Sequence, residues 1–202
     1  MPKKLTTNIL KHIKLVSKHK WLVFKFSVKL GIPFRGIMHD LSKFTPEEFL
    51  ESIKYYDGKI SPINVCKKQN GYSRAWLHHK GRNKHHDNYW VDLRSEQVAP
   101  VIPYKYMLEM ICDKLSASIT YNGKDWTNSS EYDYWQIEKT KIILNPKCER
   151  FLTDIFTKVK DEGLEKALDK KYIKSAYKKY CIDDKTEYKY VFYGEWKEKI
   201  NN

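Results

Sequence analysis

Apolar residues recur at every third or fourth position along most of the chain, which is the spacing of one face of an α-helix. The longest such stretch is 6–30, where one face collects the residues His12, Val16, His19, Val23, Phe26 and Leu30. Gly31 and Pro33 follow this face directly and predict a helix end and a new helix start. The second helix is expected to cover about 33–43.

The next segments alternate between helix and loop signals. In "TPEE", residues 45–48, Thr45 at the N-cap and Glu48 three residues later read as a capping box that starts a short third helix. Residues 57–71, "DGKISPINVCKKQNG", read as a loop because turn-forming residues dominate both ends. A further helix is predicted to begin near Ser73 and to carry the letters "RAWLHHKGRNKHH", with Gly81 as a candidate interruption.

The second half of the chain also has helical spacing. A helix is expected at about 103–121, with Gly123 as its stop. One face of this helix collects the residues Tyr106, Met110, Asp113 and Ala117. Three later segments suit further helices, at 131–145, 147–160 and 162–180. The tail at 187–196, "EYKYVFYGEW", is β-like in composition but short.

No internal repeat and no low-complexity linker separates these segments in the sequence, so one compact all-α fold is expected. We predict a helical bundle over residues 1–125 and a helical C-terminal extension, residues 126–202, packed on the same domain. The extension is rich in Tyr and Lys, as in "KKYIKSAYKKY". Whether it closes over a site or forms the surface of a homodimer stays open at this point.

The composition also indicates the net charge of the protein and the cellular compartment to expect. Lys and Arg number 38 against 25 Asp and Glu, a net charge of +13, which favours anionic partners. Lysines spread over solvated helix faces would give the same value. The four cysteines form no C-x-x-C pair, no apolar signal segment is visible, and no apolar run has the length of a membrane span. We therefore expect a cytoplasmic protein with reduced thiols and no membrane partner.

Histidines are the main candidates for chemistry. Four of the seven lie in the segment 76–90, "WLHHKGRNKHHDNYW", as two adjacent pairs seven residues apart. On one continuous helix, His79 and His86 would share a face. His19 and Asp113 lie on the apolar faces of their helices. Each of these side chains alone is more simply a core residue satisfied by a hydrogen bond or an ion pair.

In combination, these residues favour a metal site. Imidazole nitrogens and carboxylate oxygens together suit divalent transition metals, namely Mn, Fe, Co, Ni or Zn. Helices of a bundle can direct such ligands into its centre. The chain offers His19 on the first predicted helix, the pair His39-Asp40 on the second, and Asp113 on a later one. The sequence leaves open which metal binds and whether one ion or two are held.

The order of these residues resembles the HD-domain metal-dependent phosphohydrolase superfamily. "HKWLV" (19–23) is similar to the first motif of that family, a histidine with an aliphatic residue on the same helical face. "GIMHDLSKF" (36–44) is similar to its signature, in which His-Asp is followed three residues later by Lys. "EMICDKLSA" (109–117) resembles its closing Asp. The resemblance spans about 12–121, and the chain as a whole resembles small uncharacterised HD-like proteins of bacteria and phages.

The extra histidines between the His-Asp pair and the final Asp resemble family versions that hold two metal ions. By that resemblance, one ion is bound by the residues His19, His39, Asp40 and Asp113. Asp40 bridges to a second ion, which is bound by His79, His85 and His86. The choice between His78 and His79 as the inward ligand stays open. Glu109, one helical turn before Asp113, is assigned no role.

The resemblance also implies a reaction. Asp40 and Lys43 are the expected catalytic residues of a phosphohydrolase in which a metal-activated water attacks the phosphorus of a nucleotide or another phosphoester. Lys43 is expected to meet a phosphate oxygen, as is Arg82. Asn83 is expected to orient a ligand or a water. The expected partner is therefore a phosphorylated small molecule or a nucleotide.

Two other functions remain open at the level of sequence. The same ligand set filled with iron would suit an HD-type di-iron oxygenase, because some members of the family activate O₂. A basic protein that binds nucleic acid without catalysis, with a structural metal site, is the third reading. The sequence contains no recognised nucleic-acid module, so this reading ranks last.

Overall fold

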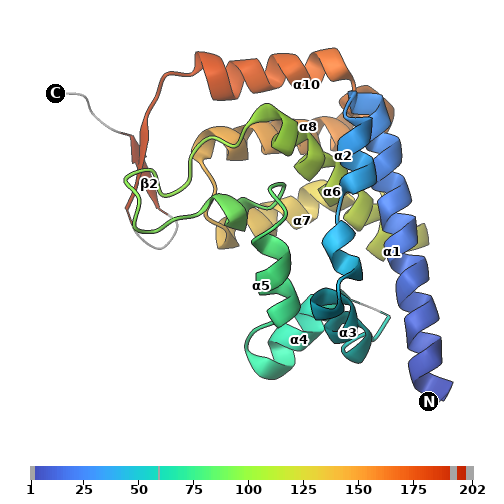
Figure 1. Ribbon diagram of the computed structural model, residues 1–202. Coiled ribbons are helices and arrows are strands. Elements are labelled where there is room, and N and C mark those ends of the chain that lie inside the picture. The colour runs from blue at the N-terminus through green and yellow to red at the C-terminus, as the bar shows by residue number, and fades with distance from the viewer. Residues whose placement is uncertain (1–2, 59, 192–194, 199–202) are drawn as a thin grey trace.

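The protein is described by a computed structural model that covers residues 3–58, 60–191 and 195–198 (Figure 1). Its earlier α-helices are α1 (Lys3–Leu30), α2 (Pro33–Met38), α3 (Pro46–Lys54), α4 (Pro62–Asn70), α5 (Arg74–Lys80) and α6 (Tyr104–Asn122). The later ones are α7 (Ser130–Glu138), α8 (Pro146–Glu162), α9 (Leu164–Ala167) and α10 (Lys170–Tyr177). The predicted all-α class is confirmed.

Short helical turns and one small sheet complete the described part. The 3-10 turns are η1 (Leu41–Phe44), η2 (Asp87–Trp90), η3 (Gly123–Asp125) and η4 (Lys139–Lys141). A π-helical turn, η5 (Lys178–Asp183), continues α10. Strands β1 (Tyr188–Tyr190) and β2 (Trp196–Glu198) pair antiparallel, so the β-like composition of the tail does produce a strand pair. No helix in these ranges is both long and apolar enough to cross a membrane.

The main hydrophobic core lies between α1, α6, α8 and α10. The α8 helix contributes a fully buried stripe at helical spacing: Phe151, Leu152, Ile155, Phe156 and Val159. Each large apolar side chain buried in this way stabilises the fold by about 1.5–3 kcal/mol. The core joins Val23 and Leu30 of α1 to Ile111 of α6 and Ile173 of α10. Residues before and after position 125 therefore share one core.

The helices α3, α4 and α5 form a smaller group beside this core (Figure 1). They pack mainly on one another, and few of their side chains are buried apolar ones: Ile53, Cys66 and Ala75. The α3 helix also touches α1. Two groups of helices therefore meet along α1 and η1, and a cavity of about 760 Å³ lies where they meet.

Several predicted boundaries were wrong for local reasons. The expected loop at 57–71 contains α4, which starts with Pro62 at its first turn and ends at Gly71 with φ of 78°. Proline at a helix start and glycine just past its end are helix signals that the turn-like composition concealed. The helix expected at 131–145 ends with α7 and η4, and the one expected at 162–180 is divided into α9, α10 and η5.

The predicted capping box was also wrong. Thr45 is the N-cap residue of α3, but its side chain donates to the carbonyl of Ser42 rather than accepting from the helix. Glu48 does not reach back to it, because its carboxylate accepts hydrogen bonds from His78 and His79. The side chain of Glu48, which the sequence assigned to the cap of its own helix, therefore contacts another helix instead.

Gly36 allows α1 and α2 to approach closely, and this approach sets the position of the residues after α2. A methyl group at position 36 would lie 2.7 Å from Cβ of Ser27 and 3.0 Å from the backbone Cα of Phe24. We expect Gly36→Ala to lower the free energy of unfolding by about 1–3 kcal/mol, because the overpacked contact includes backbone. Urea unfolding of the variant measures this loss.

Gly81→Ala is the matched control. Gly81 has an ordinary φ of −74°, and an added methyl group would come no closer than 3.4 Å to any atom. Its unfolding free energy should stay within about 0.5 kcal/mol of the wild type. Equal losses in the two variants would mean that the approach of α1 and α2 is not the tight contact inferred here.

Candidate metal centre

Five segments of the chain bring histidines and carboxylates to one place. His19 comes from the middle of α1, and Asp113 from the middle of α6. The pair His39-Asp40 lies between α2 and η1, and His79 lies near the end of α5. The remaining ligand candidates, His85 and His86, lie in the turn between α5 and η2.

A sharp break in the backbone places His39 and Asp40. The expected helix over 33–43 stops at Met38, and Asp40 has φ of 54°, the only positive φ among the described non-glycine residues. Lys20 of α1 donates to the carbonyls of Ile37 and His39, which have lost their helical partners. Because of this break, both side chains of the His-Asp pair turn inward and are 1% exposed.

The first ligand group is His19, His39, Asp40 and Asp113. His19 Nε2 lies 3.1 Å from Asp113 Oδ1 and 3.4 Å from His39 Nε2. His39 Nε2 lies 3.2 Å from Asp40 Oδ2. Atoms that share one transition-metal ion at about 2.1 Å lie about 3.0–3.4 Å apart in tetrahedral or octahedral sites. The spacing of these atoms therefore fits a common ion.

The second ligand group shares Asp40 with the first and adds His79, His85 and His86. Asp40 Oδ1 lies 3.3 Å from His79 Nε2 and 3.4 Å from His85 Nε2. The other oxygen, Oδ2, faces the first group. One carboxylate thus presents a different oxygen to each group, which is the arrangement of a bridging ligand.

Two buried glutamates fix the imidazole rings so that their Nε2 atoms face the cluster. Glu109 Oε1 lies 3.1 Å from Nδ1 of His39 and 3.1 Å from Nδ1 of His85. Glu48 Oε2 lies 2.8 Å from Nδ1 of His79. In each pair Nδ1 is the donor, so the neutral form of each imidazole has its lone pair on Nε2, as in the carboxylate–histidine–metal triads of known metal sites.

His39, His85 and Glu109 also lie close enough to form a third ligand group. We interpret these contacts as hydrogen bonds instead, because Arg35 occupies the other oxygen of Glu109 through Nε at 2.7 Å. Its Nη2 atom lies 2.5 Å from the same oxygen. Glu109 is therefore a fixed acceptor that links one histidine of each ligand group.

The unsatisfied atoms of the cluster give an independent test of whether a metal fits. Oδ1 of Asp40 is buried without a hydrogen-bond partner, whereas Oδ2 is met by the ammonium of Lys43 at 2.5 Å. The Nε2 atoms of His85 and His86 are buried without a partner as well. Buried lone pairs left without a donor are costly, and a divalent cation held by the second group would satisfy these three atoms. The donor set fits such an ion.

The electrostatics of the cluster also call for positive charge at its centre. Burial raises the pKa of Asp40, but His39 and Lys43 outweigh it and hold this pKa well below its usual range. Burial likewise opposes the charge on His39, yet Asp40 and Asp113 raise the pKa of this imidazole well above its ordinary value. Positive charge on His39 therefore adds to that of Lys43 beside these carboxylates, and a metal ion would supply such charge directly.

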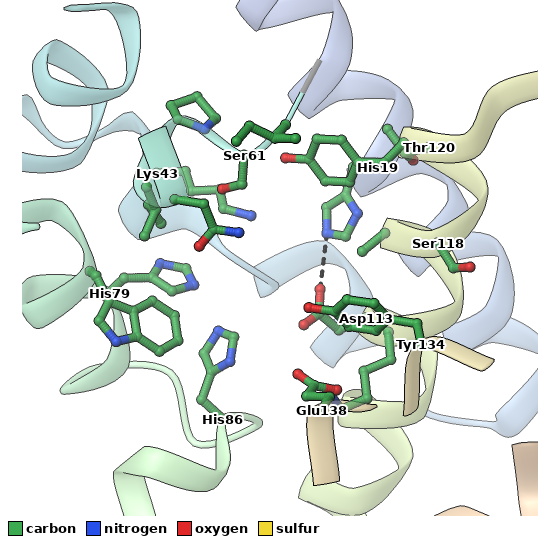
Figure 2. A pocket seen from close by; sticks show the side chains of 18 of the residues that line it. His19, Lys43, Ser61, His79, His86, Asp113, Ser118, Thr120, Tyr134 and Glu138 are labelled. Atoms are coloured by element: carbon green, nitrogen blue, oxygen red, sulfur yellow. Dashed lines mark hydrogen bonds and ion pairs between the residues drawn. The ribbon is translucent and has the colours of Figure 1, made fainter. Parts of the chain in front are cut away.

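The cluster forms part of the wall of a cavity of about 760 Å³ (Figure 2). Figure 2 shows His79 and His86 on the side of α5, and His19 and Asp113 on the opposite side. Beyond Asp113 the cavity is lined by Lys114, which lies 2.5 Å from Glu138. Burial raises the pKa of the nearby Glu131 carboxyl to about 8. Such a volume suits a small organic ligand.

Most of the predicted site residues line one of two cavities, whereas His39 and Asp40 line neither. The main one is lined by Lys43, His79, His85 and His86. His78 instead lies 2.7 Å from Glu48 and belongs to neither ligand group. Arg82 and Asn83 line a separate cavity of about 280 Å³. The shared helical face expected for His79 and His86 was wrong, since α5 ends at Lys80, but the turn that follows returns His86 to the same cavity.

Sequence reasoning missed the two supporting glutamates. Glu109 precedes Asp113 by one helical turn on a buried face, and this spacing was its only signal. Glu48 was assigned to a helix cap. No pattern in the sequence pointed to Arg35, which faces Glu109 from 74 positions earlier in the chain.

The fold and the cluster define an all-α protein with buried histidines and carboxylates that could hold metal ions. Residues 8–158 match the family described as "Family of unknown function (DUF5662)", and the chain belongs to this family. No curated protein and no solved structure matches the chain. The matched segment includes every residue of both ligand groups and extends beyond residue 125 into α8.

The two glutamates give a test of the two ligand groups. Glu109 holds a histidine of each group, whereas Glu48 holds only His79 of the second. We expect Glu109→Ala to weaken the binding of both ions, and Glu48→Ala the binding of one ion, by about 10–100-fold. Titration of the metal-free protein with Mn²⁺, followed by the EPR signal of the free ion, measures both steps.

Glu149→Ala, on the surface of α8, is the control and should bind Mn²⁺ as the wild type does. Circular dichroism melting separates a loss of metal from a loss of fold. If Glu48→Ala weakened both ions as strongly as Glu109→Ala, or if the wild type bound a single ion, the two-group arrangement would be wrong.

Proposed function

We propose that this protein is a metal-dependent phosphohydrolase that acts on a nucleotide or another small phosphoester. The observation that carries the proposal is the carboxylate of Asp40, whose two oxygens face two ligand groups at the wall of a cavity of about 760 Å³. The resemblance to HD-domain phosphohydrolases supports it, because all seven histidines and carboxylates expected from that resemblance lie in these groups. Its substrate would be a phosphorylated small molecule.

The bound ions would supply Lewis acidity and lower the pKa of a water, which is the chemistry that phosphoester hydrolysis needs at neutral pH. His19, His39 and Asp113 would hold one ion with Asp40, and His79, His85 and His86 the other. Glu109 and Glu48 orient the rings through Nδ1. The chain thereby fixes which nitrogen of each imidazole faces the cavity.

Lys43 is the residue we assign to the phosphate. Its ammonium lies at the cavity wall, 2.5 Å from Asp40 Oδ2. Burial lowers the pKa of Lys43, but Asp40 and Asp113 outweigh it and raise this pKa above its ordinary value, so the side chain stays charged at neutral pH. A fixed cation beside the cluster would stabilise the negative charge that grows on the phosphoryl oxygens in the transition state.

The ligand set alone also suits a di-iron oxygenase, so the metal and the requirement for O₂ decide between the two reactions. The four cysteines are free thiols, which is consistent with the cytoplasmic location that we propose. A nucleic-acid-binding protein with a structural metal is the remaining alternative, and it would show steeply salt-dependent binding.

The first test is metal content. We expect about two ions per chain in protein purified without a histidine tag, and their loss in Asp40→Ala, because that change removes the shared ligand from both groups. Inductively coupled plasma mass spectrometry identifies and counts the element. Iron together with O₂-dependent turnover would favour the oxygenase. No metal in the wild type, and none after reconstitution, would exclude both enzymatic functions.

The second test separates the role of Lys43 from that of the ligands. Lys43→Met should keep its metal content but lower kcat for hydrolysis by about 10²–10³-fold, since one charge that stabilises the transition state is lost. Lys174→Met, an exposed position on α10, is the control. Anaerobic assays with Mn²⁺ or Co²⁺ and a panel of phosphoesters provide the rates. A Lys43 variant with unchanged kcat would contradict the assignment.

A further inference from the structure

One end of the main cavity is lined by uncharged side chains, with Lys43 beside it. Its wall there comes from α1 before His19, from the start of α4, and from the last turns of α6. The residues concerned are His12, Leu15, Val16, Ile60, Ser61, Pro62, Ile63, Asn64, Ala117, Ser118, Thr120, Tyr121 and Asn122. None is Asp, Glu, Lys or Arg, although these types make up 31% of the chain. We call this part of the wall the uncharged end.

Two buried polar atoms at the uncharged end have no hydrogen-bond partner. His12 is 5% exposed and its Nδ1 is unsatisfied, and Thr120 is 7% exposed with an unsatisfied Oγ1. A hydroxyl on a helix can bond to the carbonyl one turn earlier, but that of Thr120 has no such bond. Buried polar groups of this kind are costly unless a ligand or a water meets them.

The positions of these two residues give the depth of the uncharged end. His12 precedes His19 by seven residues on α1, and Thr120 follows Asp113 by seven residues on α6. Seven residues of α-helix span about 10 Å. Val16 lies between the two histidines. Figure 2 shows Ser61 and Thr120 at the end of the cavity beyond His19, away from Glu138.

The chemistry of this end is that of a neutral hydrogen-bonding partner. Burial, reinforced by Lys43, lowers the pKa of His12 to about 4, so the imidazole is neutral at pH 7. Ser61, Asn64 and Thr120 offer hydroxyl and amide groups that donate and accept. Lys43 is a cation that acts on His12 and Tyr121 of this end, but its ammonium is already paired with Asp40. A carboxylate brought into this end would lose its hydration without gaining a cation.

We propose that the uncharged end binds the non-phosphate part of the ligand, and that it selects a neutral hydroxyl- or amide-bearing body over an anionic one. This inference rests on the proposed function, which places the phosphate at the metal cluster. The ligand class is thus a compound with one phosphate and a neutral polar body, such as the monophosphate of a nucleoside or of a sugar. Thr120 and His12 are the residues that recognise this body.

The test compares pairs of ligands that differ by one carboxylate remote from the phosphate. One pair is uridine 5′-monophosphate and orotidine 5′-monophosphate, and the other is glucose 6-phosphate and 6-phosphogluconate. Inorganic phosphate reports on the metal cluster alone. Calorimetric titration of the metal-loaded protein gives the Kd of each compound. In at least one pair, the neutral member should bind about tenfold or more tightly than both its anionic twin and inorganic phosphate.

Thr120→Val removes the hydroxyl and keeps the shape of the side chain. It should weaken the preferred neutral ligand about tenfold and leave the Kd of inorganic phosphate unchanged, because only the body loses a hydrogen bond. Thr157→Val is the matched control, since its hydroxyl on α8 bonds to the carbonyl of Thr153 and lies outside the cavity. His12→Phe should act as Thr120→Val does, provided that the variant melts as the wild type.

The outcomes separate the two proposals. If inorganic phosphate does not bind the metal-loaded protein, the phosphohydrolase proposal fails. If phosphate binds but the anionic twins bind as tightly as the neutral members, the inference about the uncharged end is overturned while the proposed function stands. The same holds if Thr120→Val leaves every Kd unchanged.

Discussion

The carboxylate of Asp40 is the point on which the rest of the structure depends. It is almost completely buried, its Oδ1 atom has no hydrogen-bond partner, and His39 and Lys43 hold its pKa well below the usual range. A buried carboxylate in that state is stable only where positive charge surrounds it. The left-handed backbone at Asp40, the close approach of α2 to α1 at Gly36, and the inward turn after α5 all serve to place cationic or metal-binding groups around this one side chain.

Support for these groups comes from outside the cluster. Glu109 receives a hydrogen bond from His39 and from His85, and Arg35 fixes the glutamate in turn. One side chain on α6 therefore connects the segment after α2 to the turn after α5, two parts of the chain with no backbone hydrogen bond between them. The small group of helices α3 to α5 contributes little apolar core, so such polar links add to its attachment to the main bundle.

The sequence predicted the helices and the ligands for different reasons. Helical spacing was enough for α1, α6 and α8, because each has a long apolar face. The inward positions of His19 and Asp113 followed from the apolar faces of their helices, and that of Asp40 from the order of motifs, which survives even where the helix boundary was wrong. The contacts that the sequence did not predict join residues far apart in the chain. Glu48 contacts His79 from 31 positions away, and Arg35 contacts Glu109 from 74 positions away. Local propensity carries no information on such partners, and it favoured a helix cap for Glu48.

The distribution of charge bears on which ligand the cavity admits. The net charge of +13 reflects lysines spread along the whole chain, whereas one end of the cavity has only neutral polar and apolar side chains. The net charge thus attracts anions to the protein, and the side chains that line the cavity select which ligand binds. Hydrolysis and oxygenation would use the same seven ligands, so the cluster cannot distinguish their substrates. In our proposal that distinction comes from residues such as Thr120 and His12, which line the same cavity outside both ligand groups.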